Sequence, residues 1–208
     1  MTFLPLNGVG LNYIAHIHIG FHTETSLVGN FLGDFVKGNS LQHLPAELAN
    51  GVRLHRKVDQ FTDKHPAIVH LRSKFPPSLR RMAGVVIDVT FDHYLLQHWS
   101  QFCARSPHDV LDMFYRQLAD TQAIDHPRFA QLSQSLQQHR WLSDYAHQQT
   151  CLQVFSSIER RLRHKICFAD EAYAFMQHNS TLLSEHFLQF YPQLLEYAQT
   201  CLPDSQSG

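Results

Sequence analysis

Two pairs of side chains at helical spacing could together hold a metal ion. Asp88 and Asp92 lie four residues apart in an apolar stretch, and His55 and Asp59 repeat that spacing. Residues i and i+4 share one face of an α-helix, so each pair would point in one direction. A carboxylate among Val, Ile and Phe is costly to bury unless a positive group meets it, and the candidates are an arginine or a metal ion.

The first pair also has a structural interpretation. Asp88 and Asp92 could form a buried ion-pair network with Arg80 or Arg81, and spacing alone leaves the two interpretations about even. His93 follows Asp92 directly, about 100° further round the helix. It could therefore ligate an ion or donate a hydrogen bond to a carbonyl on a neighbouring face.

The second pair is a weaker signal by itself. Basic residues surround His55 and Asp59, so a surface pair is the ordinary interpretation, and Asp88 and Asp92 elsewhere in the chain strengthen the metal hypothesis. His16 and Asp34 are further candidates. A lone histidine in an apolar segment is more often a hydrogen-bonded core residue, whereas a carboxylate in an aromatic-rich segment needs a partner. Imidazole and carboxylate together suit manganese, iron or zinc, and carboxylate-rich sites favour the harder ions.

The elements that must position these residues are predicted to be helices. No strand-type alternation persists beyond a few residues, and no hairpin signal separates two β-rich runs. We therefore predict an all-α fold, a single-domain helical bundle. Helices are expected over residues 12–21, 26–38, 46–61, 66–74, 78–102, 106–123, from 127, over 144–165 and over 171–201.

Composition excludes several classes of function. The 208 residues are 44% hydrophobic, and 17 basic against 18 acidic residues give a net charge of −1, so we expect no nucleic-acid partner. No apolar run approaches the ~20 residues that span a bilayer. No signal peptide is evident and the four cysteines form no CxxC pair, so we expect a reduced, cytoplasmic protein with no membrane partner.

The chain also lacks three common catalytic motifs: a P-loop, a G-x-S-x-G turn and a G-x-G-x-x-G turn. Their absence argues against nucleoside-triphosphate, α/β-hydrolase and dinucleotide chemistry.

Basic side chains lie close in sequence to the candidate site residues. Solvated helix faces are the ordinary interpretation, and docking of an acidic protein is the sharper one. Their nearness to the site favours an anionic, phosphate-bearing substrate. The expected partner-binding residues are Arg53, Arg56, Lys57, Arg80, Arg160 and Arg161.

An ordered set of short motifs resembles one known family. The set comprises NYIAHIHI from Asn12, GNFLGDFVKG from Gly29, HRKVD from His55, IDVTFDHYL from Ile87, then HWS, WL and FYP, the last from Phe190. Together they resemble acyl carrier protein phosphodiesterase, and they cover about residues 12–199. That family is similar to the helical HD-domain phosphohydrolases but lacks their usual motif.

The resemblance implies a metal-dependent hydrolase. The substrate would be the phosphodiester between 4′-phosphopantetheine and a serine of holo-acyl carrier protein, and the ion would be divalent, manganese in particular. Asp34 carries over from the family's Gly-Asn-x-Leu-x-Asp pattern as a catalytic or metal-binding residue. For the reaction itself we expect Arg81, or Arg80, to offset charge on the phosphoryl oxygens. The metal ligands expected from the matched motifs and their spacing are His16, Asp34, His55, Asp59, Asp88, Asp92 and His93.

The family also sets the expected domain limits. We expect an N-terminal extension over residues 1–11, the phosphodiesterase domain over 12–201 and a flexible tail over 202–208. Leu11 stands where the family usually begins, so translation from Leu11 is a hypothesis. Two other functions stay open: a helical metal phosphohydrolase for a nucleotide or another small phosphoester, and a non-catalytic module that binds acyl carrier protein.

Overall fold

The computed structural model of the chain describes residues 12–38, 41–121 and 126–202. Within these ranges the regular elements are helices, and no strand occurs, which confirms the predicted all-α, single-domain fold. The expected extension at 1–11, the hypothetical start at Leu11 and the tail after residue 202 lie outside the described residues. No described helix is long and apolar enough to cross a membrane.

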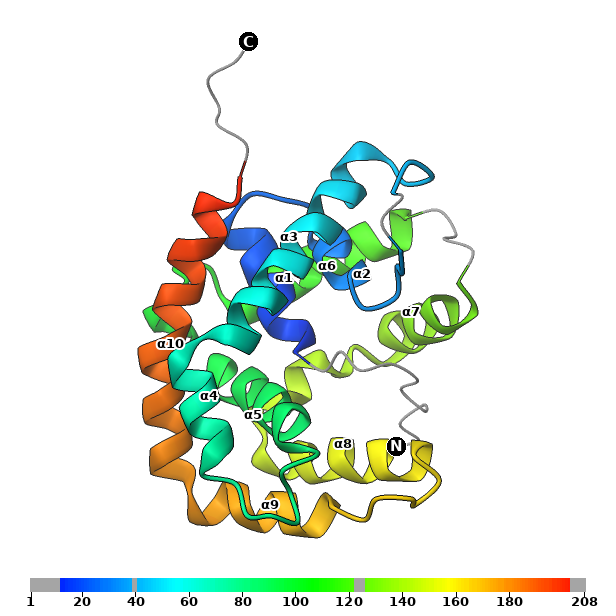
Figure 1. Ribbon diagram of the computed structural model, residues 1–208. Helices are drawn as coiled ribbons and strands as arrows, with labels where there is room; N and C mark the ends of the chain where they lie inside the picture. Colours follow the sequence, from blue (N-terminus) through cyan, green and yellow to red (C-terminus); the bar gives the residue numbers. More distant parts are fainter. Residues whose placement is uncertain (1–11, 39–40, 122–125, 203–208) are drawn as a thin grey trace.

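Ten α-helices and two short 3₁₀ helices follow one another in the described residues (Figure 1). The α-helices are α1 Tyr13–His22, α2 Leu27–Leu32, α3 Ala46–Lys64, α4 Pro66–Ser73, α5 Ala83–Gln97, α6 Pro107–Asp120, α7 Pro127–His139, α8 Gln148–Arg161, α9 Ala169–His178 and α10 Ser180–Thr200. The 3₁₀ helices are η1 Trp99–Gln101 and η2 Trp141–Ala146.

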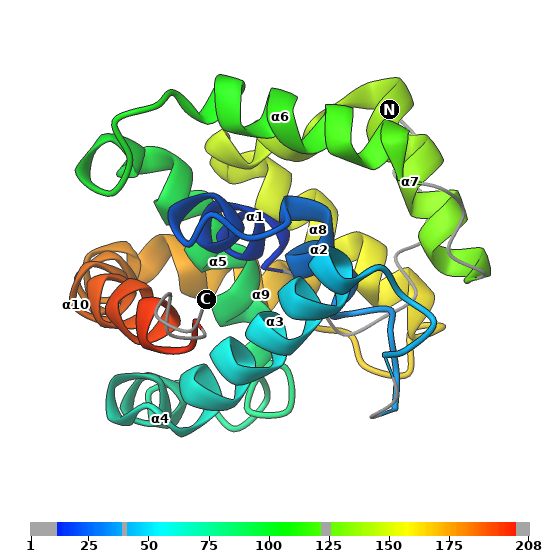
Figure 2. The ribbon, with the colours of Figure 1, turned by 90° about the horizontal axis from the view of Figure 1, so that it is seen from above.

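Helix α1 is the centre of the bundle. Its residues 13–20 are all buried, so it has no solvent-facing stripe over that length. It packs against α2, α5, α6 and α10. Figure 2 shows α1 and α5 near the middle, with α6 and α3 on opposite sides and α10 and α7 at the two ends. The two histidines of α1, His16 and His18, are therefore enclosed by other helices.

Helices α2 and α3 approach unusually closely because two glycines meet. A Cβ atom added to Gly51 of α3 would lie 2.5 Å from the carbonyl carbon of Gly29 in α2, a distance that real side chains do not allow. Any larger residue at either position would push the helices apart. The contact brings the end of α2, where Asn30 lies, against the middle of α3, where His55 lies.

Some predicted boundaries are wrong in informative ways. The helix expected over 26–38 ends at Leu32, so Asp34 lies in the turn that follows α2. The helix expected over 171–201 is two helices, α9 and α10, which meet at Asn179. The long central helix is α5 followed by η1. In each case the periodicity of the sequence alone did not place the end of the helix.

Candidate metal centre and its cavity

Four of the predicted ligands meet between α1, α3 and the turn after α2. The carboxylate of Asp59 contacts both histidines. Its Oδ1 atom lies 3.0 Å from Nε2 of His16, and its Oδ2 atom lies 3.0 Å from Nε2 of His55. Nε2 of His55 also lies 3.7 Å from Oδ1 of Asp34. The two imidazole rings stack with centroids 3.8 Å apart. The i, i+4 spacing of His55 and Asp59 on α3 thus gives the shared face that the sequence predicted.

The ring of His55 is fixed from behind. Its Nδ1–H donates a hydrogen bond to the Asn30 carbonyl oxygen at 2.8 Å. A Cβ atom on Gly33 would lie 2.1 Å from the His55 ring, so glycine is required for the ring to occupy this place. Because a carbonyl only accepts, Nδ1 carries a proton, and Nε2 presents a lone pair toward the carboxylates once the ring is neutral. This is the usual arrangement of a metal-binding histidine.

The donor set fits a divalent metal ion. Ligand atoms of His16, His55 and Asp59 all lie within 4.8 Å of one another. Among the described residues, Nδ1 of His16 and Oδ2 of the buried Asp34 have no hydrogen-bond partner, and Nε2 of His16 contacts Oδ1 of Asp59 at 3.0 Å. Nε2 of His55 faces a carboxylate oxygen at 3.0 Å, a contact that requires either a proton on this nitrogen or a metal ion bound by both groups. Two imidazoles and a carboxylate are ligands of the type that manganese, iron and zinc accept.

The electrostatics of the cluster follow from burial and mutual contact. Burial, and then the charge of His55, lower the pKa of His16, which favours the neutral ring that a metal requires. Burial raises the pKa of Asp59, but the charges and hydrogen bonds of His16 and His55 outweigh burial and hold it below its usual range. Burial also lowers the pKa of His55, but Asp59 and Asp34 outweigh it and the net direction is upward. The ionised carboxylate of Asp59 and the neutral imidazole of His16 are thus available as ligands.

The cluster opens into a cavity of about 280 Å³, lined in part by Asp34, Asp59, Asp88, Arg72 and Arg81. The side chain of Asp59 is 44% exposed, whereas those of His16 and His55 are 1% and 3% exposed. The two histidines are therefore enclosed, and the carboxylates of Asp59 and Asp34 border the cavity. The cavity holds both carboxylates and guanidinium groups, so it can accept a charged ester beside the candidate ligands.

Asp88 lies in the cavity, but it is not one of the three clustered ligand residues. Burial, and next the charge of Asp59, raise the pKa of Asp88 to about 8, and the charge of Arg72 partly offsets this. Asp88 therefore holds a proton near neutral pH in the metal-free protein. The sequence analysis predicted Asp88 as a metal ligand, and the structure places it at the wall of the cavity.

Asp92 and His93 are not part of the cluster, and their geometry favours structural roles. The two oxygens of Asp92 accept hydrogen bonds from the backbone N–H groups of Ile14 at 3.0 Å and Ala15 at 2.8 Å. Asp92 thus caps the first turn of α1, which receives no such bond from the side chain of Asn12. Nδ1 of His93 hydrogen-bonds the Tyr145 carbonyl oxygen at 2.7 Å, which is the alternative that the sequence left open.

Arg72 is a cavity residue that the sequence analysis missed. It comes from α4, and its Nη2 donates to Oδ1 of Asp63 at 2.7 Å. A Cβ atom on Gly84 would lie 3.4 Å from the same nitrogen, so the guanidinium lies beside α5 at ordinary contact distance. The Nε atom of Arg72 is buried and has no hydrogen-bond partner. No spacing rule relates Arg72 to Asp88, because only the fold brings α4 and α5 together.

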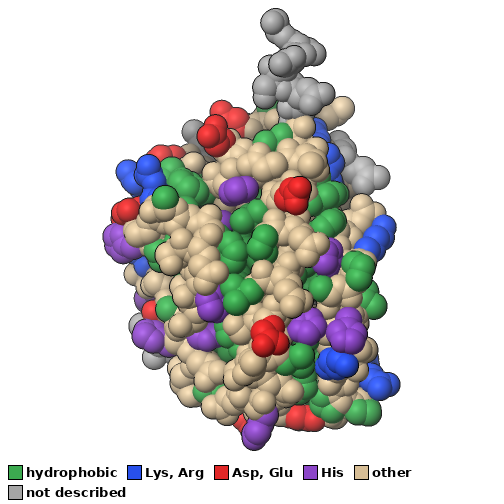
Figure 3. All heavy atoms as spheres, turned by 90° about the vertical axis from the view of Figure 1, so that its left-hand side faces the viewer, with side chains coloured by type: hydrophobic (Ala, Val, Ile, Leu, Met, Phe, Trp, Pro, Cys, Tyr) green, Lys and Arg blue, Asp and Glu red, His purple; other side chains and the backbone are tan. Residues whose placement is uncertain are grey.

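The predicted partner-binding residues do not form one patch of equivalent side chains. Arg56 donates to the Val36 carbonyl oxygen at 2.8 Å and is half-buried, and Arg161 is half-buried as well. Figure 3 shows the face of the molecule over α10, on which hydrophobic and histidine side chains are scattered and lysine and arginine lie near the margins. The exposed members of the predicted set are Arg53, Lys57, Arg80 and Arg160.

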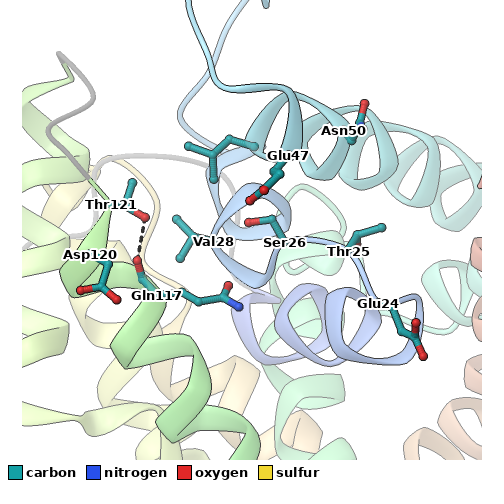
Figure 4. Close-up of a pocket in the computed structure, with 10 residues that line it drawn as sticks. Glu24, Thr25, Ser26, Val28, Glu47, Asn50, Gln117, Asp120 and Thr121 are labelled. Atoms are coloured by element: carbon teal, nitrogen blue, oxygen red, sulfur yellow. Dashed lines mark hydrogen bonds between the residues drawn. The ribbon is translucent and has the colours of Figure 1, made fainter.

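A larger cavity, of about 620 Å³, lies away from the cluster (Figure 4). It is bounded by the turn between α1 and α2, the beginning of α3 and the end of α6. Glu24, Glu47 and Asp120 are among its lining residues, and none of the lining residues is basic. Three carboxylates without a balancing cation repel a phosphate group. The smaller cavity at the histidine–carboxylate cluster is therefore the better candidate for a phosphoester.

The fold and the site together define a class of protein: an all-α protein in which a cluster of histidines and carboxylates borders a charged cavity. The sequence profile of the family described as acyl carrier protein phosphodiesterase matches residues 11–194. The chain belongs to the acyl carrier protein phosphodiesterase family and is a hydrolase.

Named relatives agree along nearly the whole chain. A protein of Klebsiella pneumoniae named acyl carrier protein phosphodiesterase is 34% identical over 194 residues, which cover 91% of this chain and 98% of the relative. The protein of that name from Yersinia pestis has the same identity and coverage. The one from Escherichia coli O6:K15:H31 is 33% identical over 189 residues, covering 90% and 97%. No solved structure matches the chain, so the likeness to HD-domain phosphohydrolases stays a prediction.

Proposed function

We propose that this protein hydrolyses the phosphodiester between 4′-phosphopantetheine and the serine of holo-acyl carrier protein, and that it requires a divalent ion, with manganese as the first choice. The observation that carries the metal requirement is the meeting of His16, His55 and Asp59 beside a cavity that also holds guanidinium groups. The names of the relatives support the carrier protein as substrate. The charge pattern of the cavity suits a phosphodiester, which is an anion.

Different residues at the site would bind the metal ion and accept a proton. His16, His55 and Asp59 would hold the ion, and the Asn30 carbonyl keeps the ring of His55 in the orientation that binding needs. A divalent ion supplies Lewis-acid polarisation of the phosphoester and generates a nucleophile at neutral pH. Asp34 borders the same cavity with an unpartnered buried oxygen, and burial raises its pKa. Asp34 is therefore suited to accept a proton from the attacking water at Oδ2.

The two cavity arginines would act on the ester itself. Arg81 is exposed at the rim of the cavity, and Arg72 is held against α5 with its buried Nε free of hydrogen bonds. Guanidinium groups in this position offset the negative charge of the nonbridging phosphoryl oxygens. The exposed Arg53, Lys57, Arg80 and Arg160 would then attract the acidic carrier protein at longer range.

Intact-mass analysis of the carrier tests this proposal directly. Holo-acyl carrier protein is incubated with the protein and manganese, and with the variant Asp59→Ala. Asp120→Asn is the matched control, because Asp120 is an exposed carboxylate in the other cavity. We expect the carrier to lose the mass of phosphopantetheine with the wild type and the control, and to stay intact with Asp59→Ala or with chelator.

Two other results would redirect the assignment. An unchanged carrier together with rapid cleavage of a nucleotide or a chromogenic phosphodiester would show a small-molecule phosphohydrolase. An unchanged carrier that nevertheless binds the protein, without any metal retained, would show a non-catalytic binding module. Either result would refute the proposed reaction.

A further inference from the structure

Asn12 stands at the beginning of α1 and lines the cavity beside the metal centre. Its backbone carbonyl oxygen accepts a hydrogen bond from the N–H group of His16 at 3.2 Å. That bond places Asn12 one helical turn before His16, and residues four apart lie on one side of a helix. The side chain of Asn12 is half-buried. A polar residue that the proposed reaction does not yet use thus lies next to a candidate metal ligand and inside the same cavity.

An asparagine in this position usually caps its helix, but Asn12 does not. Asparagine is among the most favourable N-cap residues, because its side-chain oxygen accepts a hydrogen bond from an N–H group of the first turn. The side chain of Asn12 makes no such bond, and the carboxylate of Asp92 accepts from the N–H groups of Ile14 and Ala15 instead. The capping by Asp92 therefore leaves the amide of Asn12 available for another partner.

Among the polar side chains that line this cavity, the amide of Asn12 is the neutral group with unused hydrogen-bonding capacity. No hydrogen bond joins it to another described residue. Thr62, the other neutral polar residue of the lining, donates its hydroxyl to the Val58 carbonyl oxygen at 2.9 Å. The remaining polar lining residues are aspartates and arginines. Asn12 alone of this lining therefore offers free amide donors together with a free carbonyl acceptor.

We propose that the side-chain amide of Asn12 binds the pantetheine arm of the substrate, at the hydroxyl and amide groups nearest the phosphate; the inference rests on the proposed function. Arg72 and Arg81 suit the charged phosphoryl oxygens, whereas a neutral group that both donates and accepts suits a hydroxyl or an amide. Val85 adds an apolar side chain to the cavity, which suits the dimethyl carbon between the phosphate and that hydroxyl. Asn12 thus distinguishes phosphoesters by the arm that they carry.

Calorimetric titration with two ligands tests this inference without relying on turnover. The full chain in manganese-containing buffer is titrated with 4′-phosphopantetheine and, separately, with inorganic phosphate. The wild type should bind 4′-phosphopantetheine more tightly than phosphate, and Asn12→Ala should reduce that preference about three- to tenfold, because neutral hydrogen bonds to the arm are lost. Asn50→Ala is the matched control, because Asn50 is an exposed asparagine that lines the other cavity. A preference that is equal in all three proteins, or absent from the wild type, overturns the inference.

Thermal unfolding separates binding of the arm from a structural role of Asn12. Because Asp92 caps α1, Asn12→Ala should unfold at the temperature of the wild type when chelator is present and ligand is absent. In manganese-containing buffer, added 4′-phosphopantetheine should raise the unfolding temperature of the wild type and of Asn50→Ala more than that of Asn12→Ala. An Asn12→Ala protein that unfolds earlier without ligand, and responds to 4′-phosphopantetheine as the wild type does, would show that Asn12 serves the helix alone.

Activity on two substrates keeps this inference apart from the proposed function. In Asn12→Ala, kcat/KM should fall further for holo-acyl carrier protein than for bis(4-nitrophenyl) phosphate, a phosphodiester without a pantetheine arm. Equal falls for the two substrates would show that Asn12 acts on the phosphoester itself and would refute its role toward the arm. Release from the carrier by the wild type, with an unchanged ligand preference in Asn12→Ala, would refute the inference and leave the proposed function intact. A preference that depends on Asn12, without any release from the carrier, would refute the proposed function and support the binding role.

Discussion

Replacing Asp92 by alanine should destabilise the whole protein while leaving the metal centre competent in the molecules that fold. Asp92 accepts hydrogen bonds from the buried backbone N–H groups of Ile14 and Ala15, and the side chain of Asn12 offers α1 no substitute. Leaving a buried donor unsatisfied costs about 1–3 kcal/mol. Two donors therefore predict a loss of about 2–6 kcal/mol, a large part of the ~5–15 kcal/mol that stabilises a typical domain.

Urea denaturation in the presence of chelator measures this loss, because bound metal would otherwise add its own stabilisation. Asp92→Asn should fall between the wild type and Asp92→Ala, since an amide keeps one acceptor. Manganese affinity of the folded fraction should remain near that of the wild type in both variants, while Asp59→Ala loses it. If Asp92→Ala instead keeps wild-type stability in chelator and loses manganese binding, the carboxylate is a ligand and the capping argument is wrong.

Three further predictions concern the centre, its cavity and the docking of the partner. Gly33→Ala should lower manganese affinity by about tenfold or more, as seen by calorimetry, because its Cβ would lie 2.1 Å from the ring of His55. In chelator-treated protein, Asp88→Asn should become more stable relative to the wild type as the pH rises. The pKa of Asp88 is about 8 in the folded protein against an ordinary value of 3.8. Between these two pH values the folded wild type must retain a proton that the unfolded chain has lost, so the free energy of unfolding of the wild type falls as the pH rises. Equal pH profiles of unfolding for the two proteins would exclude that assignment. The KM for the acidic carrier should rise with ionic strength, and less steeply in Arg160→Gln, whereas a KM that is flat from low to high salt would rule out electrostatic docking.

Local spacing predicted the part of the site that one helix supplies. His55 and Asp59 share a face of α3 and contact each other, as their i, i+4 spacing required. The same rule placed Asp88 and Asp92 on one side of α5, but it could not say that one would reach the cavity and the other the beginning of α1. That difference depends on which element packs against each position of α5, which periodicity does not contain.

Contacts between helices explain what local spacing could not predict. Asp34 meets His55 only because Gly29 and Gly51 let α2 and α3 approach closely, so its place at the site depends on a packing contact. Arg72 lies on α4 and Asp88 on α5, and only the tertiary fold brings both to one cavity. The residue types indicated which chemistry the site could perform, whereas contacts between helices decided which residues belong to the site.

The capping of α1 by Asp92 also sets an order of events during synthesis. The acceptor for the first turn of α1 stands 78 residues further along the chain than Ile14. At ~5–20 residues per second, a ribosome needs about 4–16 seconds to add that length. Throughout this interval the nascent α1 lacks its cap and has no α5 to pack against. The cap of the helix that carries His16 is therefore complete only after translation has passed Asp92 in α5.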